Sequence, residues 1–90
     1  MEKREMRITV IGLPSARVQQ AIINARAAST GFDEKPRITW VQDVHKIAGM
    51  GPLVVPTIKI NDEVKVEGRI PSVYEFETWI EEEMEEELVA

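Results

Sequence analysis

Apolar and polar positions follow two different periods along the first half of the chain. Residues 7–12, RITVIG, form a short β-branched run, which predicts a buried strand. Residues 15–29 carry apolar side chains at helical spacing and predict a helix. Residues 36–41 predict a second strand, and residues 42–48 predict a short helix. The first half is therefore expected to run strand, helix, strand, helix.

Residue types at the boundaries indicate where these two helices begin and end. Ser15 is a preferred capping residue and is expected to begin the first helix, which Gly31 is expected to end. Asp43 is expected to begin the short helix, with Val44 and Ile47 facing the core. Both helices would then follow directly on a strand.

The second half begins with a predicted hairpin. Residues 54–60 and 63–67 read as two strands joined by a turn at Asn61 and Asp62. Alternation along the two strands predicts four apolar residues on one face: Ile58, Ile60, Val64 and Val66. The opposite face would be polar.

The last helix has a strong start signal. Ser72 and Glu75 have the spacing of a capping box, in which each side chain accepts a hydrogen bond from the other residue's backbone N–H. An apolar stripe follows at helical spacing: Val73, Phe76, Ile80, Met84 and Leu88. Glutamates occupy most of the other positions, so the outer surface of this helix is expected to be acidic.

These elements give the order β-α-β-α-β-β-α in a single domain over residues 1–90. A helix joins the first two strands, which are therefore expected to be parallel with a right-handed crossover. The last two strands form an antiparallel hairpin. The predicted fold class is α/β, with a four-stranded mixed sheet and helices on both faces.

Composition excludes several kinds of chemistry. The chain has no cysteine, so disulfides, thiolate nucleophiles and cysteine-ligated metal sites are absent. Its single histidine, His45, makes a histidine-rich metal site impossible. We therefore expect no metal and no cofactor.

Charge and hydropathy narrow the range of partners. The net charge is −5, and residues 75–90 contain eight glutamates and no basic residue. Residues 1–74 have no clear basic stripe, so nucleic acid is not an expected partner. No apolar run approaches the ~20 residues of a membrane helix. We expect no membrane association and a cytoplasmic location.

Two stretches resemble a known family. The segment LVVPTIKINDEVKVEGRIPSVYEFETWIEE, residues 53–82, is similar to the C-terminal half of the small thioredoxin-like family of redox-active disulfide proteins. The segment ITVIGLPSARVQQAIINARAA, residues 8–28, resembles the first half of that family, whose layout glutaredoxins share. The resemblance implies a thioredoxin-like fold.

The chain departs from that family at the redox motif. The family carries Gly-x-x-Cys-x-x-Cys, and here Ser15 falls on the first cysteine and Val18 on the second. Dithiol exchange needs one thiolate to attack and a second thiol to resolve the mixed disulfide. We therefore expect no such activity. The chain is either a natural cysteine-less branch or a sequence whose cysteines were replaced by engineering.

Three features of a ligand site remain. Free N–H groups at the helix start near Ser15 favour an anion, and Arg17 in the first turn could meet an acidic ligand. The resemblance implies that Pro56 is a cis-proline beside this helix end, where Val55 could pair with an extended peptide. Ser15 and Arg17 also have simpler interpretations, as a helix cap and as a solvated surface residue.

We therefore predict a binding or interaction module that uses the helix N-terminus and cis-proline face and has no catalytic residue. The alternative is a thiol-disulfide oxidoreductase, or a glutathione-handling relative, whose active-site cysteines are replaced. A third hypothesis gives the acidic last helix or a sheet edge a role in assembly. The expected partner is an unknown protein, a peptide or a small thiol ligand. The expected state is a monomer or weak homodimer.

Overall fold

The computed structural model describes the backbone of residues 5–89 and the side chains of residues 5–86. The elements, in chain order, are β1 (Arg7–Ile11), α1 (Ala16–Ser29), β2 (Arg37–Val41), α2 (Val44–Gly49), β3 (Thr57–Ile60), β4 (Glu63–Glu67) and α3 (Val73–Val89). The predicted order β-α-β-α-β-β-α is confirmed. No helix in the described part of the chain is long and apolar enough to cross a membrane.

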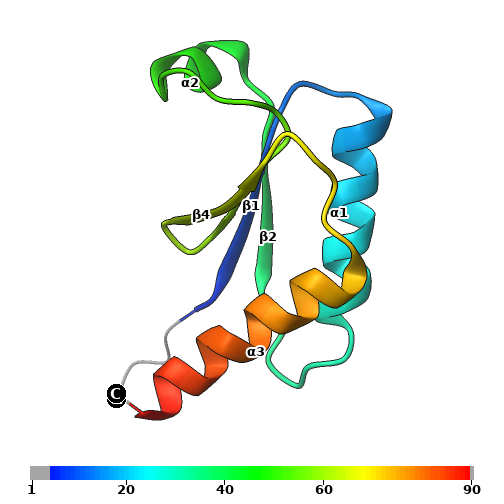
Figure 1. The fold of residues 1–90 in the computed structure, drawn as a ribbon, viewed down its shortest axis with the longest axis vertical. Helices are drawn as coiled ribbons and strands as arrows, with labels where there is room; N and C mark the ends of the chain where they lie inside the picture. Colours follow the sequence, from blue (N-terminus) through cyan, green and yellow to red (C-terminus); the bar gives the residue numbers. More distant parts are fainter. Residues whose placement is uncertain (1–4, 90) are drawn as a thin grey trace.

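The four strands form one mixed sheet in the order β2-β1-β3-β4 (Figure 1). Strands β1 and β2 are parallel, as expected for two strands joined by a helix. Strand β1 pairs antiparallel with β3, and β3 pairs antiparallel with β4. The carboxyl end of β1 therefore leads into α1, and the start of β3 lies next to that point.

Helices α1 and α3 pack against each other and against one face of the sheet. Four strand side chains under them are fully buried: Ile8, Val10, Ile58 and Ile60. Phe76 and Ile80 of α3, on the predicted stripe, are also fully buried. The side chain of Leu88 lies outside the described residues. Burying a side chain of this size contributes about 1.5–3 kcal/mol, so this one-sided core supplies most of the folding energy.

The second face of the sheet has a helix at one end only (Figure 1). Helix α2 lies at one end of the sheet and has no buried residue, so helices do not cover both faces fully (Figure 1). Val44 was expected to face the core, yet its side chain is 55% exposed. Ile11 and Thr57, two residues on this face, are buried, and they lie at the end next to α2. A six-residue helix is too short to cover four strands.

A bulge in β4 places Val64 on the opposite side of the hairpin from the predicted one. Ile58 pairs with Val66, but the next residue, Lys59, pairs with Val64, so the register shifts between them. Because a shift of one residue moves a side chain to the opposite face, Val64 lies with Lys59 on the open face and is 46% exposed. Ile58 and Val66 keep the predicted core-facing side.

The end of α1 also differs from the prediction. The helix ends at Ser29, and its C-cap is Thr30, which has φ −64° in the right-handed region and whose N–H bonds back to the Ala28 and Arg26 carbonyls. Gly31 follows this cap and does not adopt positive φ. The Thr30 hydroxyl also donates to the Ala27 carbonyl at 2.7 Å. A side-chain and backbone cap thus ends the helix without a left-handed glycine.

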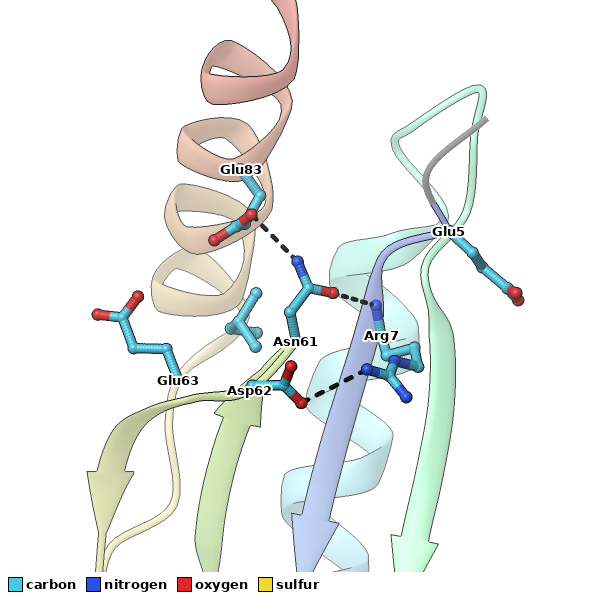
Figure 2. Close-up of a pocket in the computed structure, with 7 residues that line it drawn as sticks. Glu5, Arg7, Asn61, Asp62, Glu63 and Glu83 are labelled. Atoms are coloured by element: carbon cyan, nitrogen blue, oxygen red, sulfur yellow. Dashed lines mark hydrogen bonds and ion pairs between the residues drawn. The ribbon is translucent and has the colours of Figure 1, made fainter. Parts of the chain in front are cut away.

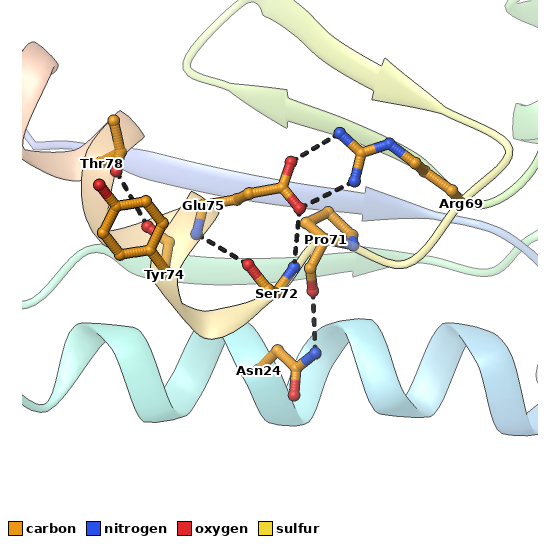
Figure 3. Close-up of polar contacts among 7 residues, drawn as sticks. All are labelled: Asn24, Arg69, Pro71, Ser72, Tyr74, Glu75 and Thr78. Atoms are coloured by element: carbon orange, nitrogen blue, oxygen red, sulfur yellow. Dashed lines mark hydrogen bonds and ion pairs between the residues drawn. The ribbon is translucent and has the colours of Figure 1, made fainter.

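The capping box at the start of α3 is confirmed and is extended by an arginine (Figure 3). The Ser72 N–H donates to Glu75 at 3.1 Å, and the Glu75 N–H donates to the Ser72 hydroxyl at 3.1 Å. Arg69 donates two hydrogen bonds to the same carboxylate, at 2.8 and 2.6 Å. Asn24 of α1 donates to the Pro71 carbonyl at 2.8 Å and ties the two helices together.

The hydrogen bonds from Arg69, and then that from the Ser72 N–H, lower the pKa of Glu75 to about 2. A carboxylate whose pKa falls on folding stabilises the protein above its unfolded pKa of about 4.5. That stabilisation is lost as the pH falls from about 4.5 toward about 2. The Glu75 side chain is 31% exposed and Arg69 is 54% exposed, so solvent screening reduces the effect.

We expect Glu75→Gln to lower stability at neutral pH by about 1–2 kcal/mol and to weaken the acid dependence of unfolding. Urea denaturation between neutral pH and pH of about 2 measures both effects. Glu86→Gln, an exposed change on the same helix, is the control. Equal acid-induced losses in wild type and Glu75→Gln would contradict this prediction.

Candidate functional site

A hollow of about 330 Å³ lies where the carboxyl end of β1 meets the start of α1 and the segment before β3. Eight residues line it: Leu13, Pro14, Ser15, Arg17, Val18, Ile47, Val55 and Pro56. The structure therefore brings together all five positions singled out from the sequence, Ser15, Arg17, Val18, Val55 and Pro56. Ile47 of α2 was expected to face the core and instead lines this hollow.

Ser15 acts as the N-cap of α1. Its backbone is extended, with φ −161° and ψ 164°, and its hydroxyl oxygen accepts a hydrogen bond from the Val18 N–H at 3.2 Å. This bond satisfies one of the free N–H groups of the first turn. No carboxylate or imidazole lines the hollow within the described residues, so no base is available to activate the hydroxyl.

Val18, the second motif position, belongs to the core. Its side chain is 2% exposed and packs with the apolar cluster under α1. A Cβ atom on Gly12 would lie only 2.7 Å from the Val18 Cγ2, 3.6 Å from the Val55 Cβ and 3.9 Å from the Pro56 Cα. The Val18 methyl therefore disfavours any side chain at Gly12, whereas the other two distances are ordinary van der Waals contacts. The Val55–Pro56 peptide bond beside it is cis.

Arg17 and Gly68 join the helix start to the chain after β4. Arg17 donates to the Gly68 carbonyl at 2.7 Å, and the Gly68 N–H donates to the Pro56 carbonyl at 2.9 Å. Gly68 has φ 80°, a conformation that favours glycine. A Cβ there would also lie 2.7 Å from Val54 Cγ1. The predicted contact of Arg17 with an acidic ligand stays a prediction, since this guanidinium already has a partner in the chain.

Two residues that shape the site, Gly68 and Trp40, were not predicted to do so. The Trp40 indole N–H donates to the Gly12 carbonyl at 2.8 Å, and the Gly12 N–H donates to the Val41 carbonyl at 3.0 Å. Both bonds fix the turn between β1 and α1 against β2. In the sequence, Gly68 directly follows a predicted strand. A glycine there indicates a turn but does not show which residues it contacts.

The backbone of Val55 has no hydrogen-bond partner in the described part of the chain. Neither its N–H nor its C=O forms a hydrogen bond with another residue in the range 5–89. The Val55 side chain is 42% exposed. Four more large apolar residues, on the segments that line the hollow or adjoin them in sequence, are at least 45% exposed: Leu13, Val44, Met50 and Val54. We call these four residues and Val55 the apolar rim. Arg17 is the one charged residue among the eight that line the hollow.

A second hollow, of about 550 Å³, lies at the opposite end of the sheet (Figure 2). Asn61 links two sides of this hollow, because it accepts a hydrogen bond from the Arg7 N–H at 2.9 Å and donates one to Glu83 at 3.1 Å. Arg7 also pairs with Asp62 at 3.5 Å. Asn61 has φ 55°, so these bonds hold the hairpin turn. Among residues 5–89, no group of three His, Asp or Glu side chains could hold a metal.

The contact between Gly12 and Val18 is testable by a double-mutant cycle. We expect Gly12→Ala to lower stability by about 1–3 kcal/mol, because the new methyl overlaps a stiff β-branched side chain. In a Val18→Ala background the same change should cost much less, since the obstructing methyl is gone. Urea denaturation of the four proteins gives the coupling energy. Additive losses would contradict this contact.

Comparison with known proteins agrees with this geometry. No similar sequence was found among curated proteins. A family model described as thioredoxin domain matches residues 6–81, which span every strand and the first half of α3. The matched range includes the turn after β1, the Val55–Pro56 step and the capping box. This cysteine-free chain belongs to the thioredoxin domain family.

Proposed function

We propose that this protein is a non-enzymatic binding module that recognises an extended, uncharged peptide segment at the hollow beside Ser15. Exchange of disulfides is excluded as its own activity, because the chain has no cysteine to supply a thiolate. The two positions that match the family cysteines hold a helix cap and a core side chain instead. What remains is a binding surface without reactive groups.

The free backbone of Val55 is the observation that carries the proposal. An extended segment can pair with an exposed N–H and C=O by strand addition, and alternate side chains of that segment then enter neighbouring pockets. The hollow next to Val55 is suited to one such side chain. Val55 therefore supplies the hydrogen bonds, and the hollow supplies the apolar contact.

The surroundings of the hollow favour an apolar and uncharged ligand. The apolar rim exposes five large residues on the segments that line or adjoin the hollow, and exposed apolar surface is typical of interaction sites. Arg17 is held by the Gly68 carbonyl at 2.7 Å. Two backbone hydrogen bonds contribute about 0.5–1.5 kcal/mol each and one buried side chain about 1.5–3 kcal/mol. These contributions total about 2.5–6 kcal/mol before the cost of association, so we expect weak binding, with a Kd of about 1 mM or higher.

Binding can be tested with the acetylated and amidated pentapeptide Ser-Leu-Val-Leu-Ser. In a titration followed by ¹H–¹⁵N NMR, we expect amide shifts in residues 13–18 and 53–57, with residues 61–63 unchanged. Val55→Asp should weaken binding about tenfold or more, because a desolvated carboxylate opposes apolar contact. Reduced glutathione, a charged tripeptide, should bind more weakly than the pentapeptide.

Val64→Asp is the matched control, since Val64 is exposed to a similar degree, 46% against 42%, on a different surface. It should bind the pentapeptide as wild type does. The proposal is wrong if the pentapeptide shifts no amide near the hollow, or if the two variants weaken binding equally.

The absence of redox activity has its own test. We expect wild type not to accelerate the reduction of insulin disulfides by dithiothreitol. The double variant Ser15→Cys, Val18→Cys should accelerate it, because it restores an attacking thiol at the helix start and a resolving thiol behind it. Ser15→Cys alone, which lacks the resolving thiol, is the control. Acceleration by wild type would overturn the non-enzymatic proposal. A double variant that folds but is inactive would show that positions 15 and 18 no longer have the geometry needed for dithiol exchange.

A further inference from the structure

The two edges of the sheet differ in how well they are protected from pairing with another strand. Strand β4 contains a bulge and carries Glu63, Lys65 and Glu67, and bulges and charges are the features by which natural edge strands avoid pairing. Strand β2, RITWV, pairs with β1 without a bulge, and its one charged residue is Arg37 at its start. Strand β2 is therefore the edge to which another strand can add.

Two residues of β2 direct their backbone groups away from the sheet. The Arg37 N–H donates to the Met6 carbonyl at 2.9 Å, so Arg37 bonds toward β1. Because successive residues of a strand direct their N–H and C=O groups to opposite sides, Ile38 and Trp40 direct theirs to the edge. Neither backbone forms a hydrogen bond with another residue in the described part of the chain. The edge thus offers two donors and two acceptors.

The residues of β2 match one another in an antiparallel pairing centred on Thr39. Ile38 of each copy then lies opposite Trp40 of the other, and these are the residues whose backbone groups face the edge. A β-branched residue opposite an aromatic one is a favourable cross-strand pair, and so is threonine opposite threonine. Ile38 and Trp40 are only partly buried against the core, so the pairing would also cover their remaining exposed surface.

The charges at the two ends of β2 suit the same register. The first charged residue before the strand is Lys35, and the first after it is Asp43. Antiparallel pairing about Thr39 places Lys35 of one copy opposite Asp43 of the other. Arg37 lies opposite Val41, so no like charges face each other. Parallel pairing of two copies in register would instead set Arg37 beside Arg37, which favours the antiparallel arrangement.

Helix α1 has room for its copy on the same face of an extended sheet. It packs on the core face against β1 and β2, so its axis lies over these two strands. At about 4.8 Å per strand, the axes of α1 and its copy would lie about 10 Å apart. Packed helices are usually about 8–10 Å apart, so the two helices would touch without overlap.

We propose that β2 pairs antiparallel with β2 of a second copy of this chain, about a two-fold axis at Thr39. The four strands of each copy then join in one continuous sheet, and the dimer is closed because the same edge serves both partners. The contact is small, so we expect a weak dimer that forms at about millimolar concentration. The proposal does not rest on the peptide site, because no residue of β2 lines the hollow.

Crosslinking tests the position of the axis, since a chain without cysteine accepts a single introduced thiol. Residues opposite each other in a non-hydrogen-bonded antiparallel pair have Cα atoms about 4.5 Å apart, and disulfides usually join Cα atoms about 4.4–6.8 Å apart. With diamide as oxidant, Thr39→Cys at about 100 μM should form a disulfide dimer at least about ten times faster than Val64→Cys. Val64 is the matched control, a strand residue 46% exposed on the β4 edge. Equal rates overturn the proposal.

Charged variants at the same position test association without a covalent bond. In sedimentation equilibrium of wild type at about 1 mM, we expect a weight-average mass above that of the monomer. Thr39→Lys and Thr39→Glu should each be monomeric, because like charges would meet at the axis. An equal mixture of these two variants should associate again, since opposite charges then meet there.

Val64→Lys is the control for added charge and should associate as wild type does, with circular dichroism to check that every variant is folded. A wild type that is monomeric at about 1 mM overturns the proposal and leaves the β2 edge to a strand of a different protein. A mixture of Thr39→Lys and Thr39→Glu that stays monomeric also overturns it, as does loss of association in Val64→Lys.

Discussion

Packing of α1 and α3 against one face of a small sheet is the interaction on which the rest of this structure depends. Ile8, Val10, Ile58 and Ile60 are fully buried beneath these helices. A chain of 90 residues has one core of this kind, and α2 is too short to build a second layer. The other face and the end of the sheet beside α2 are therefore left largely uncovered.

The same packing fixes the site at the start of α1. Val18 is held in the core, and its side chain takes the space next to Gly12, so the turn after β1 passes close to Val55 and Pro56. Arg17 and Gly68 close the other side through a 2.7 Å hydrogen bond. The apolar hollow is thus a consequence of core packing, and no reactive side chain takes part in forming it.

Much of this fold could be predicted from the sequence because its signals are local. The spacing of Ser72 and Glu75 predicts a capping box, which the two 3.1 Å hydrogen bonds confirm. Contacts between distant segments could not be predicted in this way. Val64 leaves the core face because of a register shift in the hairpin, and the Arg69 hydrogen bonds to Glu75 depend on the path of a loop. The contacts of Gly68 with Arg17 and Pro56 could not be predicted either, since these residues lie far from it in sequence.

Ser15 and Val18, the two motif positions, lie in different surroundings, and each residue type suits its own position. Ser15 is exposed at a helix start, where a hydroxyl satisfies a backbone N–H better than a thiol, a weak acceptor. Val18 is buried, where an additional methyl group fills space that a smaller cysteine would leave. Each residue therefore favours a stable fold over thiol chemistry. The helix cap at Ser15 and the core contact at Val18 are thus formed without sulfur, and the turn between them keeps its shape.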